Sequence, residues 1–385
     1  MTATGAKKVR NGEIPEGWRS LQWGDLATLE YGKGLRNYSQ VGKYPVYGTN
    51  GQIGYCDQCL SGSPGVIIGR KGAYRGVHYS KGPFFVIDTA FYLKPKQDNL
   101  DLRFAYYELL KQDINSLDTG SAIPSTTRES FYSLQVLLPP LSEQRVIAKV
   151  LSDLDAKIEL NHQMNKTLES IAQAIFKQWF VDFKFPGHEK TKFVNGLPEG
   201  WREGNLVDTC EIIMGQSPPG ETYNESGDGI AFYQGNRDFG FRYPSTRVYC
   251  TAPTRIAEAG DVLISVRAPV GALNITLGQC AIGRGVAALR MKHYSNGFLY
   301  YFLLTQNNLW DRYNSEGTVF GCLNKAEFHK MQVIIPSDKV MALFDEIITP
   351  IQAMIQSREE ESRALTQIRD SLLPRLMSGK IRVKE

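Results

Sequence analysis

The chain has 385 residues, of which 44 are Lys or Arg, 40 are Asp or Glu and 42% are hydrophobic. This length accommodates two ordinary domains, and the nearly balanced charge means that any nucleic-acid surface must come from uneven placement of basic residues. The sequence has no run of eighteen apolar residues and no charged-then-apolar signal segment, so we expect a cytoplasmic protein that does not enter a membrane.

The first feature in chain order is a repeated phrase. PEGW at 15–18 returns at 198–201, and in both places a glycine turn follows, EYGKG at 30–34 and IMGQS at 213–217. The offset between the copies stays at 183 residues. A recurrence that keeps its register indicates an internal repeat rather than a local motif.

The next match is a β-branched segment that predicts a buried strand in each copy. Residues 66–68 (VII) match 262–264 (VLI), and each segment leads into a basic turn. The offset has grown to 196. The second copy therefore has about thirteen extra residues, and we expect them in the segment GQSPPGETYNESGDG at 215–229.

The strongest match closes each copy and continues into a long apolar pattern. Residues 120–140 match 317–337 at an offset of 197, which then holds for another forty residues. Apolar residues recur there at steps of three and four, which is typical of a coiled-coil seam. The middle of the seam is polar, and its members are Asn161 and Asn165 in the first copy and Arg358 and Ser362 in the second.

Helix start signals occur at Ser152-Asp153 and Thr349-Pro350, so we expect a short helix, a break and then a long helix of about 27 residues in each copy. Such a helix spans about 40 Å and cannot be buried by one small domain. We expect the two long helices to pair antiparallel, with a globular domain at each end. The alternative that each helix packs only on its own domain remains open.

The predicted fold class is α+β, with two similar mixed domains, a pair of long antiparallel helices and a pseudo-twofold internal repeat. The expected segments are a first globular domain at 1–140, a first long helix at 141–184, a second globular domain at 185–336, and a second long helix with the C-terminal tail at 337–385.

Sequence signals for catalysis are weak. The string SPPG at 217–220 lacks the aromatic residue that an adenine methyltransferase loop requires, and no glycine-rich phosphate loop is present. Cys56 and Cys59 have a metal-like spacing without a second ligand pair, and the five histidines are dispersed. We therefore predict no catalytic residues and no metal.

With these residues in view, the chain resembles the specificity subunit of Type I restriction-modification systems. The most family-specific phrase is PPLSEQRVIA at 139–148, and GRKGAYRGVHYS at 69–80 is similar to the basic strand-turn of such recognition domains. The second copy departs from the first phrase with PSDKVMALF at 336–344. The resemblance covers the whole chain because order, spacing and repeat all agree.

The resemblance implies a non-catalytic subunit that binds double-stranded DNA. Each recognition domain would read one half of a bipartite, asymmetric site, and the helices would set the spacer and dock two methylase subunits, with two restriction subunits completing the complex. S-adenosylmethionine, and ATP with Mg, would belong to those partners, leaving no cofactor in this chain. A rod of about 40 Å would separate the two readers by about twelve base pairs.

Candidate DNA contacts are basic, amide, hydroxyl and tyrosine side chains at predicted turns, since arginine and amide groups read base edges and lysine and hydroxyl groups meet phosphates. They are Lys33, Arg36, Asn37, Arg70, Lys71, Tyr74, Arg75, Thr127 and Arg128 in the first copy, and Gln216, Tyr223, Asn236, Arg237, Arg242, Arg267, Asn324 and Lys325 in the second.

Aromatic residues near the end of the first long helix, Trp179, Phe180 and Phe183, are candidates for partner binding. They would pack against a recognition domain or a methylase subunit, or else lie in the core of this chain. Two rival functions also remain: a scaffold that presents two domains to ligands other than DNA, and an enzyme that acts alone.

Overall fold

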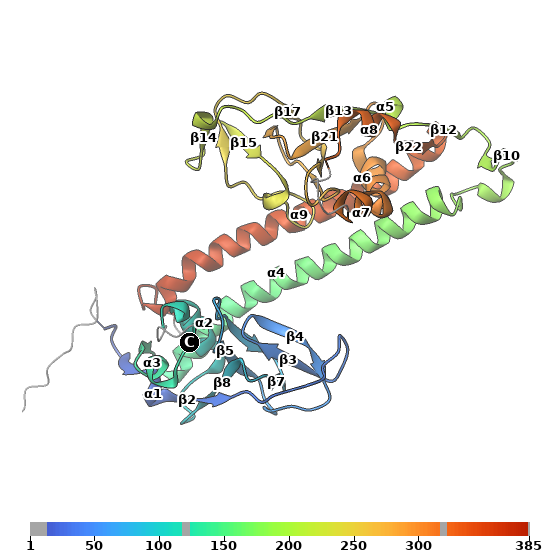
Figure 1. Ribbon diagram of the computed structural model, residues 1–385. Coiled ribbons are helices and arrows are strands. Elements are labelled where there is room, and N and C mark those ends of the chain that lie inside the picture. Colours follow the sequence, from blue (N-terminus) through green and yellow to red (C-terminus); the bar gives the residue numbers. More distant parts are fainter. Residues whose placement is uncertain (1–13, 118–123, 316–321, 384–385) are drawn as a thin grey trace, which may run out of the picture. The chain divides into compact units, whose positions relative to one another are not determined.

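The computed structural model describes residues 14–117, 124–315 and 322–383 (Figure 1). The chain forms two compact units. Unit 1 combines residues 1–160 with 361–385, and unit 2 comprises 161–360. Two long helices contribute to both units: α4 (Leu141–Phe176) runs from unit 1 into unit 2, and α9 (Asp338–Met377) runs back.

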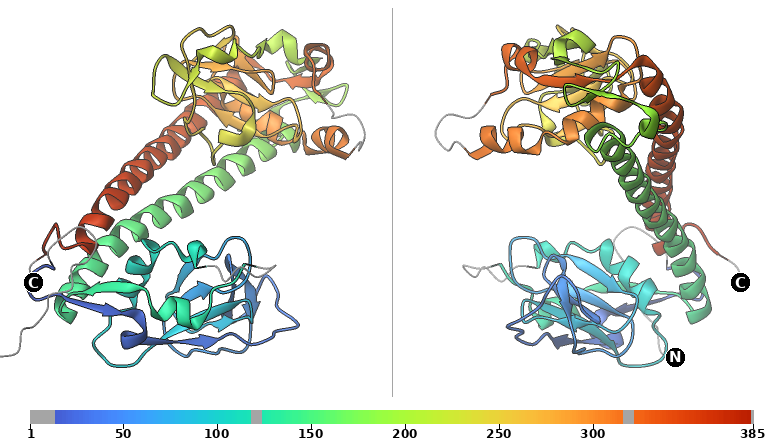
Figure 2. Two further views of the ribbon diagram at one scale, coloured as in Figure 1. Left: turned by 60° about the vertical axis from the view of Figure 1, so that its left-hand side comes forward. Right: turned by 90° about the vertical axis from the view of Figure 1, so that its right-hand side faces the viewer.

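Unit 1 has a mixed α/β domain in which antiparallel strands predominate (Figures 1 and 2). A central sheet has the order β2 (Ala27–Tyr31), β8 (Ala90–Pro95), β5 (Gly65–Gly69), β6 (Val77–Ser80), and a second sheet has the order β4 (Gly51–Cys56), β3 (Tyr44–Gly48), β7 (Phe85–Val86). A third pair joins β1 (Arg19–Gln22) to β9 (Gln135–Leu138), and the helices are α1 (Trp23–Leu26), α2 (Leu102–Leu110) and α3 (Arg128–Tyr132).

Unit 2 repeats this plan with additions. Its central sheet has the order β13 (Cys210–Met214), β21 (Val286–Met291), β18 (Val262–Ser265), β19 (Leu273–Ile275); the second sheet has the order β14 (Tyr223–Asn224), β16 (Tyr249–Cys250), β15 (Ile230–Tyr233), β20 (Cys280–Ile282), β17 (Ile256–Ala257). The remaining pairs are β12 (Arg202–Asn205) with β22 (Gln332–Ile335) and β10 (Phe193–Val194) with β11 (Leu197–Pro198), and the helices are α5 (Leu206–Thr209), α6 (Asn296–Leu304), α7 (Asn307–Ser315) and α8 (Lys325–Lys330).

The strand pairing confirms the internal repeat. Ile67 pairs with Tyr92 in unit 1, and Leu263 pairs with Ala288 in unit 2, so both partners shift by 196 residues. The strands β5 and β18 are buried along their whole length, which explains why each reads as a continuous apolar run in the sequence. The predicted α+β class with two similar domains is therefore confirmed. The matched residues 120–123 and 317–321 lie outside the described part.

The position of the extra residues in the second copy differs from the prediction. The parallel pair Tyr47–Val86 corresponds to Tyr233–Ile282, which fixes the equivalence of β3 and β15. Only three extra residues precede β15; the other ten lie between β15 and β18. The two copies share no sequence match between the glycine turn and the strand β18, so the sequence cannot locate the insertion within this stretch. The strand register locates it.

The inserted residues form the long connection from β15 to β16, and this connection packs on α4. Arg242, which is 1% exposed, forms an ion pair with Glu169 of α4 and donates to the hydroxyl of Tyr301 at 2.7 Å. Burial raises the pKa of Tyr301 to about 12. The phenol therefore stays protonated and donates in turn to Glu169 at 3.4 Å.

Both long helices are continuous, so the predicted breaks near 152 and 349 are wrong. Ile147 and Leu151 are buried before the first expected break, and Phe344 and Ile348 before the second. Continuing the helix keeps these side chains in the seam. Their burial outweighs the hydrogen bond lost at Pro350, a loss that costs about 3 kcal/mol in a helix interior. The helices have 36 and 40 residues and so exceed the predicted length.

Within each unit, the halves of α4 and α9 pair antiparallel through the predicted seam. In unit 1, Asp155 accepts from Arg369 at 2.8 Å, and Lys157 lies 3.1 Å from Glu361. In unit 2, the buried Asn165 donates to the backbone carbonyl of Ile355 at 3.2 Å. The helices also pack on the globular domains, since Tyr107 of α2 donates to Asp155 of α4 at 2.6 Å and Phe176 contacts Phe298 of α6. The alternative that each helix packs only on its own domain is therefore wrong.

The tryptophan of each PEGW phrase is held by a different kind of contact in the two units. Trp18 donates its indole N–H to Glu143 at 2.9 Å, and Arg382 binds both oxygens of that carboxylate at 2.8 and 3.0 Å. In unit 2 the repeat positions of Glu143 and Arg382 hold Val340 and Phe185. Trp201 instead stacks on Phe185 with ring centroids 5.1 Å apart, so an apolar contact replaces the polar network.

Glu143→Ala should lower the free energy of unfolding by about 1–3 kcal/mol, because the buried indole N–H of Trp18 loses its acceptor. Glu143→Gln keeps an oxygen for the indole and should cost less. Urea unfolding followed by tryptophan fluorescence would measure both variants. Equal destabilisation by the two substitutions would contradict the acceptor role.

Glu169→Leu should destabilise unit 2 by about 3–5 kcal/mol, because it leaves the guanidinium of Arg242 buried without its counter-charge. The double variant Glu169→Leu/Arg242→Met should recover most of this loss. Urea unfolding monitored by circular dichroism would test the pair, and a single Glu169→Leu variant with wild-type stability would refute it.

Candidate nucleic-acid interface

Loops from four parts of unit 1 meet beside its central sheet. Backbone N–H groups of Gly32 and Lys33 donate to Ala90 and Val86, and the N–H of Arg70 donates to Thr89. The segment before α3 joins the same group, since the N–H of Thr126 donates to the carbonyl of Arg70. These bonds hold residues 31–33, 70–76, 86–90 and 124–127 together, and we call this arrangement the loop frame of unit 1.

Unit 2 has an equivalent loop frame, formed by residues 215–217, 234–235, 266–271, 283–286 and 322–324. The N–H groups of Gly215 and Gln216 donate to Val286 and Ile282, and the N–H of Leu323 donates to Val266. Each of these bonds has a counterpart in unit 1 at the repeat offset. The two units therefore present different side chains from one backbone framework.

The repeated glycine turn is required by this framework. A Cβ atom at Gly32 would lie 2.0 Å from the carbonyl oxygen of Ile87, and one at Gly215 would lie 2.2 Å from that of Gly283. Any larger residue would push these segments apart. The glycines seen in the sequence thus serve the close approach of two loops.

An arginine–tyrosine–arginine stack lies at the loop frame of unit 1. The guanidinium of Arg128 lies 4.1 Å from the ring centroid of Tyr31, and that of Arg70 lies 4.8 Å from it. Arg70 also donates to the carbonyl of Asp88 at 3.1 Å. The stack concentrates two positive charges, and half of the Tyr31 side chain is exposed beside them. Such cation–π contacts orient guanidinium groups that are otherwise mobile.

The remaining predicted contacts of unit 1 fall into two groups. Lys33, Arg36, Asn37, Lys71 and Tyr74 are exposed. Arg75 is buried, and its guanidinium donates to the carbonyls of Gly72, Ile114 and Asn115. Because Arg75 holds the turn together from inside, we leave it out of the proposed DNA surface.

A half-buried histidine packs against the same turn. Burial lowers the pKa of His78, so the ring is neutral near pH 7. Its Nε2 lies 3.3 Å from the carbonyl of Thr49, and its ring would be 2.5 Å from a Cβ at Gly76. His78 therefore has a structural position beneath the loop frame.

In unit 2, the predicted contacts are similarly divided. Gln216, Arg237, Arg267, Asn324 and Lys325 are exposed, while Tyr223 and Asn236 are partly buried. Arg242 is buried against α4, so we exclude it from the proposed DNA surface as well. The two register-matched positions Thr127 and Asn324 are N-caps: their side chains accept from Ser130 and Glu327 at 3.1 Å each. This capping explains why both copies keep a capping residue type there.

The sequence reading overlooked two residues of the loop frames. Tyr31 immediately precedes the repeated glycine, and Arg284 stands between Gly283 and Gly285. Arg284 Nε lies 3.3 Å from Ser217 Oγ, and Gln234 Nε2 donates to the same oxygen at 2.9 Å. The sequence feature that could have identified Arg284 is the Gly-Arg-Gly turn that directly follows a predicted strand.

The aromatic residues just beyond the end of α4 belong to the core of unit 2. Trp179 and Phe180 are buried, and Phe180 packs on Phe298 and Phe344 with ring centroids 4.9 and 4.8 Å apart. Phe183 packs edge-on against Trp201. Of the three locations considered from the sequence, they occupy the core and the face of a recognition domain.

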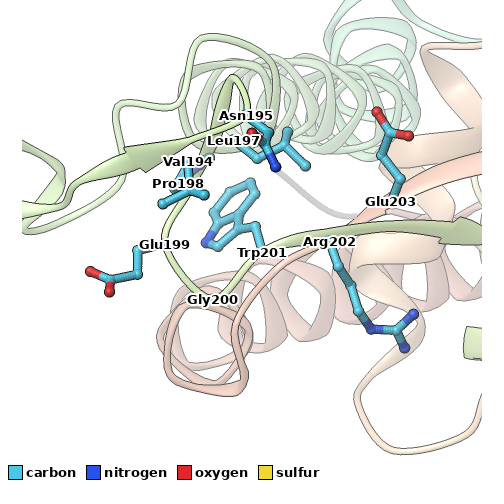
Figure 3. A pocket seen from close by; sticks show the side chains of 9 residues that line it. All are labelled: Val194, Asn195, Leu197, Pro198, Glu199, Gly200, Trp201, Arg202 and Glu203. Carbon is cyan, nitrogen blue, oxygen red and sulfur yellow. The ribbon is translucent and has the colours of Figure 1, made fainter.

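A pocket of about 560 Å³ lies at the second PEGW phrase (Figure 3). The side chains of Glu199, Arg202 and Glu203 point in different directions there and share no common centre. Across the described ranges, no group of three or more His, Cys, Asp or Glu side chains could hold a metal ion. Among the described helices, none has the length and apolar character needed to span a membrane.

Comparisons with known proteins agree with this architecture. The family model for the Type I restriction modification DNA specificity domain matches residues 15–170 and 198–364. The chain is 32% identical over 256 residues to the putative type I restriction enzyme MjaX specificity subunit of Methanocaldococcus jannaschii, an alignment that covers 65% of this chain and 60% of that protein. It is also 24% identical over 408 residues to the MjaIX specificity subunit of the same organism, covering 100% of this chain and 90% of that one.

A solved structure has the same fold. The crystal structure of a Type I restriction-modification system S subunit from M. genitalium matches with a TM-score of 0.69 and 20% identity, covering 96% of this chain and 98% of that one. The two matched ranges of the family model each include one loop frame. The chain therefore belongs to the Type I restriction modification DNA specificity domain family and contains two copies of that domain.

Proposed function

We propose that the chain is the DNA-reading, non-catalytic subunit of a Type I restriction-modification complex, and that each unit reads one half of a bipartite site. The observation that carries this proposal is the pair of equivalent loop frames, each presenting exposed basic side chains. Their backbone bonds match, but their side chains differ. We therefore expect two half-sites of different sequence.

Phosphate contacts would come from exposed lysines and arginines on the loop frames. Lys71 and Arg267 occupy equivalent positions, two residues beyond β5 and β18 respectively, and both are exposed. Exposed cations at one position in both copies are suited to the sugar–phosphate backbone, which is the same in every sequence. Base contacts would come from side chains that differ between the frames.

The long helices would set the spacing and bind the methylase subunits. Several large apolar side chains on α4 and α9 are exposed, and a docked subunit would cover them. They are Leu160, Ile171, Ile347, Met354 and Ile368. Two methylase subunits, and two restriction subunits in the full complex, would supply S-adenosylmethionine-dependent methyl transfer and ATP-dependent cleavage.

We expect the complex to act on DNA in the cytoplasm of a prokaryotic cell. The side chains of this chain would then recognise DNA and take no part in methyl transfer. Methyl transfer by this chain without a partner would contradict the proposal.

The complex of this chain with its methylase partner should bind one bipartite duplex far more tightly than random DNA. Lys71→Ala and Arg267→Ala should each weaken binding to all sequences and lower the salt slope of log K by about one, because each removes one phosphate contact. Lys190→Ala, an exposed lysine outside both loop frames and both long helices, is the matched control. Gel shifts at several salt concentrations would measure this, and equal binding of all duplexes by the wild type would refute DNA reading.

Inserting about four residues near Asn165 and near its repeat position Ser362 would lengthen both helices by about 6 Å. The bases of both half-sites should stay unchanged while the spacer between them changes. Methylation mapping of cells that carry the variant would show the result. An altered half-site with an unaltered spacer would contradict the assignment of spacing to the helices.

A further inference from the structure

Three polar side chains meet where the loops of unit 2 converge. Ser217 follows the repeated glycine turn, Gln234 follows β15, and Arg284 follows β20. Ser217 Oγ lies 2.9 Å from Gln234 Nε2 and 3.3 Å from Arg284 Nε. All three line a pocket of about 440 Å³, next to the stacked rings of Tyr223 and Phe232.

The backbone of Arg284 is held on both sides. A Cβ at Gly283 would lie 2.6 Å from Gln234 Oε1, and one at Gly285 would lie 2.5 Å from the carbonyl oxygen of Gln234. The N–H of Gly285 donates to that carbonyl at 3.0 Å, and the N–H of Arg284 lies 3.4 Å from Ser217 Oγ. The side chain therefore starts from a fixed position.

The guanidinium of Arg284 is tethered at one end and open at the other. Only its Nε contacts Ser217 Oγ; within the part of the chain that the structure describes, its two terminal amino groups form no hydrogen bond. Arg247 lines the same pocket but is occupied, since it bonds Glu225 and Asp238 at 3.2 Å each. The two arginines thus differ in what they can offer a ligand.

We propose that Arg284 is a specificity-determining residue that reads a guanine in the second half-site, with Ser217 and Gln234 as positioning residues. This inference rests on the proposed DNA-reading function. Two parallel N–H donors of a guanidinium match the O6 and N7 acceptors that guanine presents in the major groove. A tethered guanidinium on a fixed backbone suits discrimination between bases, whereas a phosphate contact tolerates a mobile cation.

The first unit lacks this cluster although its backbone is equivalent. Gly34, Gly48 and Asp88 occupy the repeat positions of Ser217, Gln234 and Arg284. Asp88 offers acceptors where Arg284 offers donors, so the position cannot read guanine in unit 1. The predicted guanine contact is therefore confined to one half-site.

The test uses the full chain in complex with its methylase partner. Methylation mapping of cells that express each variant would give the recognised motif, and competition binding with duplexes altered at one base would give the discrimination. Arg284→Ala and Arg284→Lys should both lose roughly 5- to 150-fold of the discrimination at one guanine of the second half-site. Arg284→Lys keeps the positive charge but lacks the two parallel N–H donors of the guanidinium, so this variant distinguishes base reading from phosphate binding.

Arg247→Ala is the matched control. It removes an arginine that lines the same pocket and whose guanidinium is already bonded to Glu225 and Asp238. It should leave the motif unchanged. Ser217→Ala should weaken discrimination at the same guanine, and Ser217→Thr, which restores the hydroxyl, should recover it. A circular dichroism melting curve of each complex tests whether the variant is folded. Because Arg284 is exposed, we expect its variants to melt at the wild-type temperature.

An unchanged motif in both Arg284 variants would overturn the inference, and so would full discrimination in Arg284→Lys or a change confined to the first half-site. A wild-type complex without any bipartite motif would instead overturn the proposed function itself. The two failures are therefore distinguishable.

Discussion

Burial of the seam between α4 and α9 is the constraint on which the rest of the structure depends. Each helix contributes one part to each unit, so unit 1 includes a distant segment, 361–385, whereas unit 2 is continuous from 161 to 360. The seam is apolar at its ends and polar in its middle, where Asn161, Asn165 and Ser362 are buried. Polar side chains at such positions reduce stability but restrict the register of pairing.

The tryptophan at the equivalent position of each domain is held by a different kind of contact. Trp18 is fixed by a carboxylate and an arginine, whereas Trp201 stacks on Phe185. Unit 2 adds the buried pair Arg242–Glu169 through its inserted connection. The two domains are therefore anchored by non-equivalent contacts.

The loop frames explain how two readers with different surfaces arise from one fold. Backbone hydrogen bonds and closely packed glycines fix the loops, so that substitutions at exposed positions change chemistry without changing the path of the chain. The stack of Arg70, Tyr31 and Arg128 in unit 1 and the cluster at Arg284 in unit 2 are the two surfaces that we propose for reading DNA. Binding residues on a rigid scaffold of this kind are typical of recognition loops.

The sequence by itself determined the repeat, the fold class, the seam and the family, because periodic burial and matched turns leave patterns in the order of residues. Only the tertiary structure decided where the insertion lies, that both helices run through Ser152 and Pro350, and that Arg75 and Arg242 face inward. The physical reason is that local signals such as a helix cap or a basic turn are weak compared with burial of apolar side chains. An arginine's role depends on which carbonyl or carboxylate reaches it from a distant segment, and one-dimensional spacing does not contain that information.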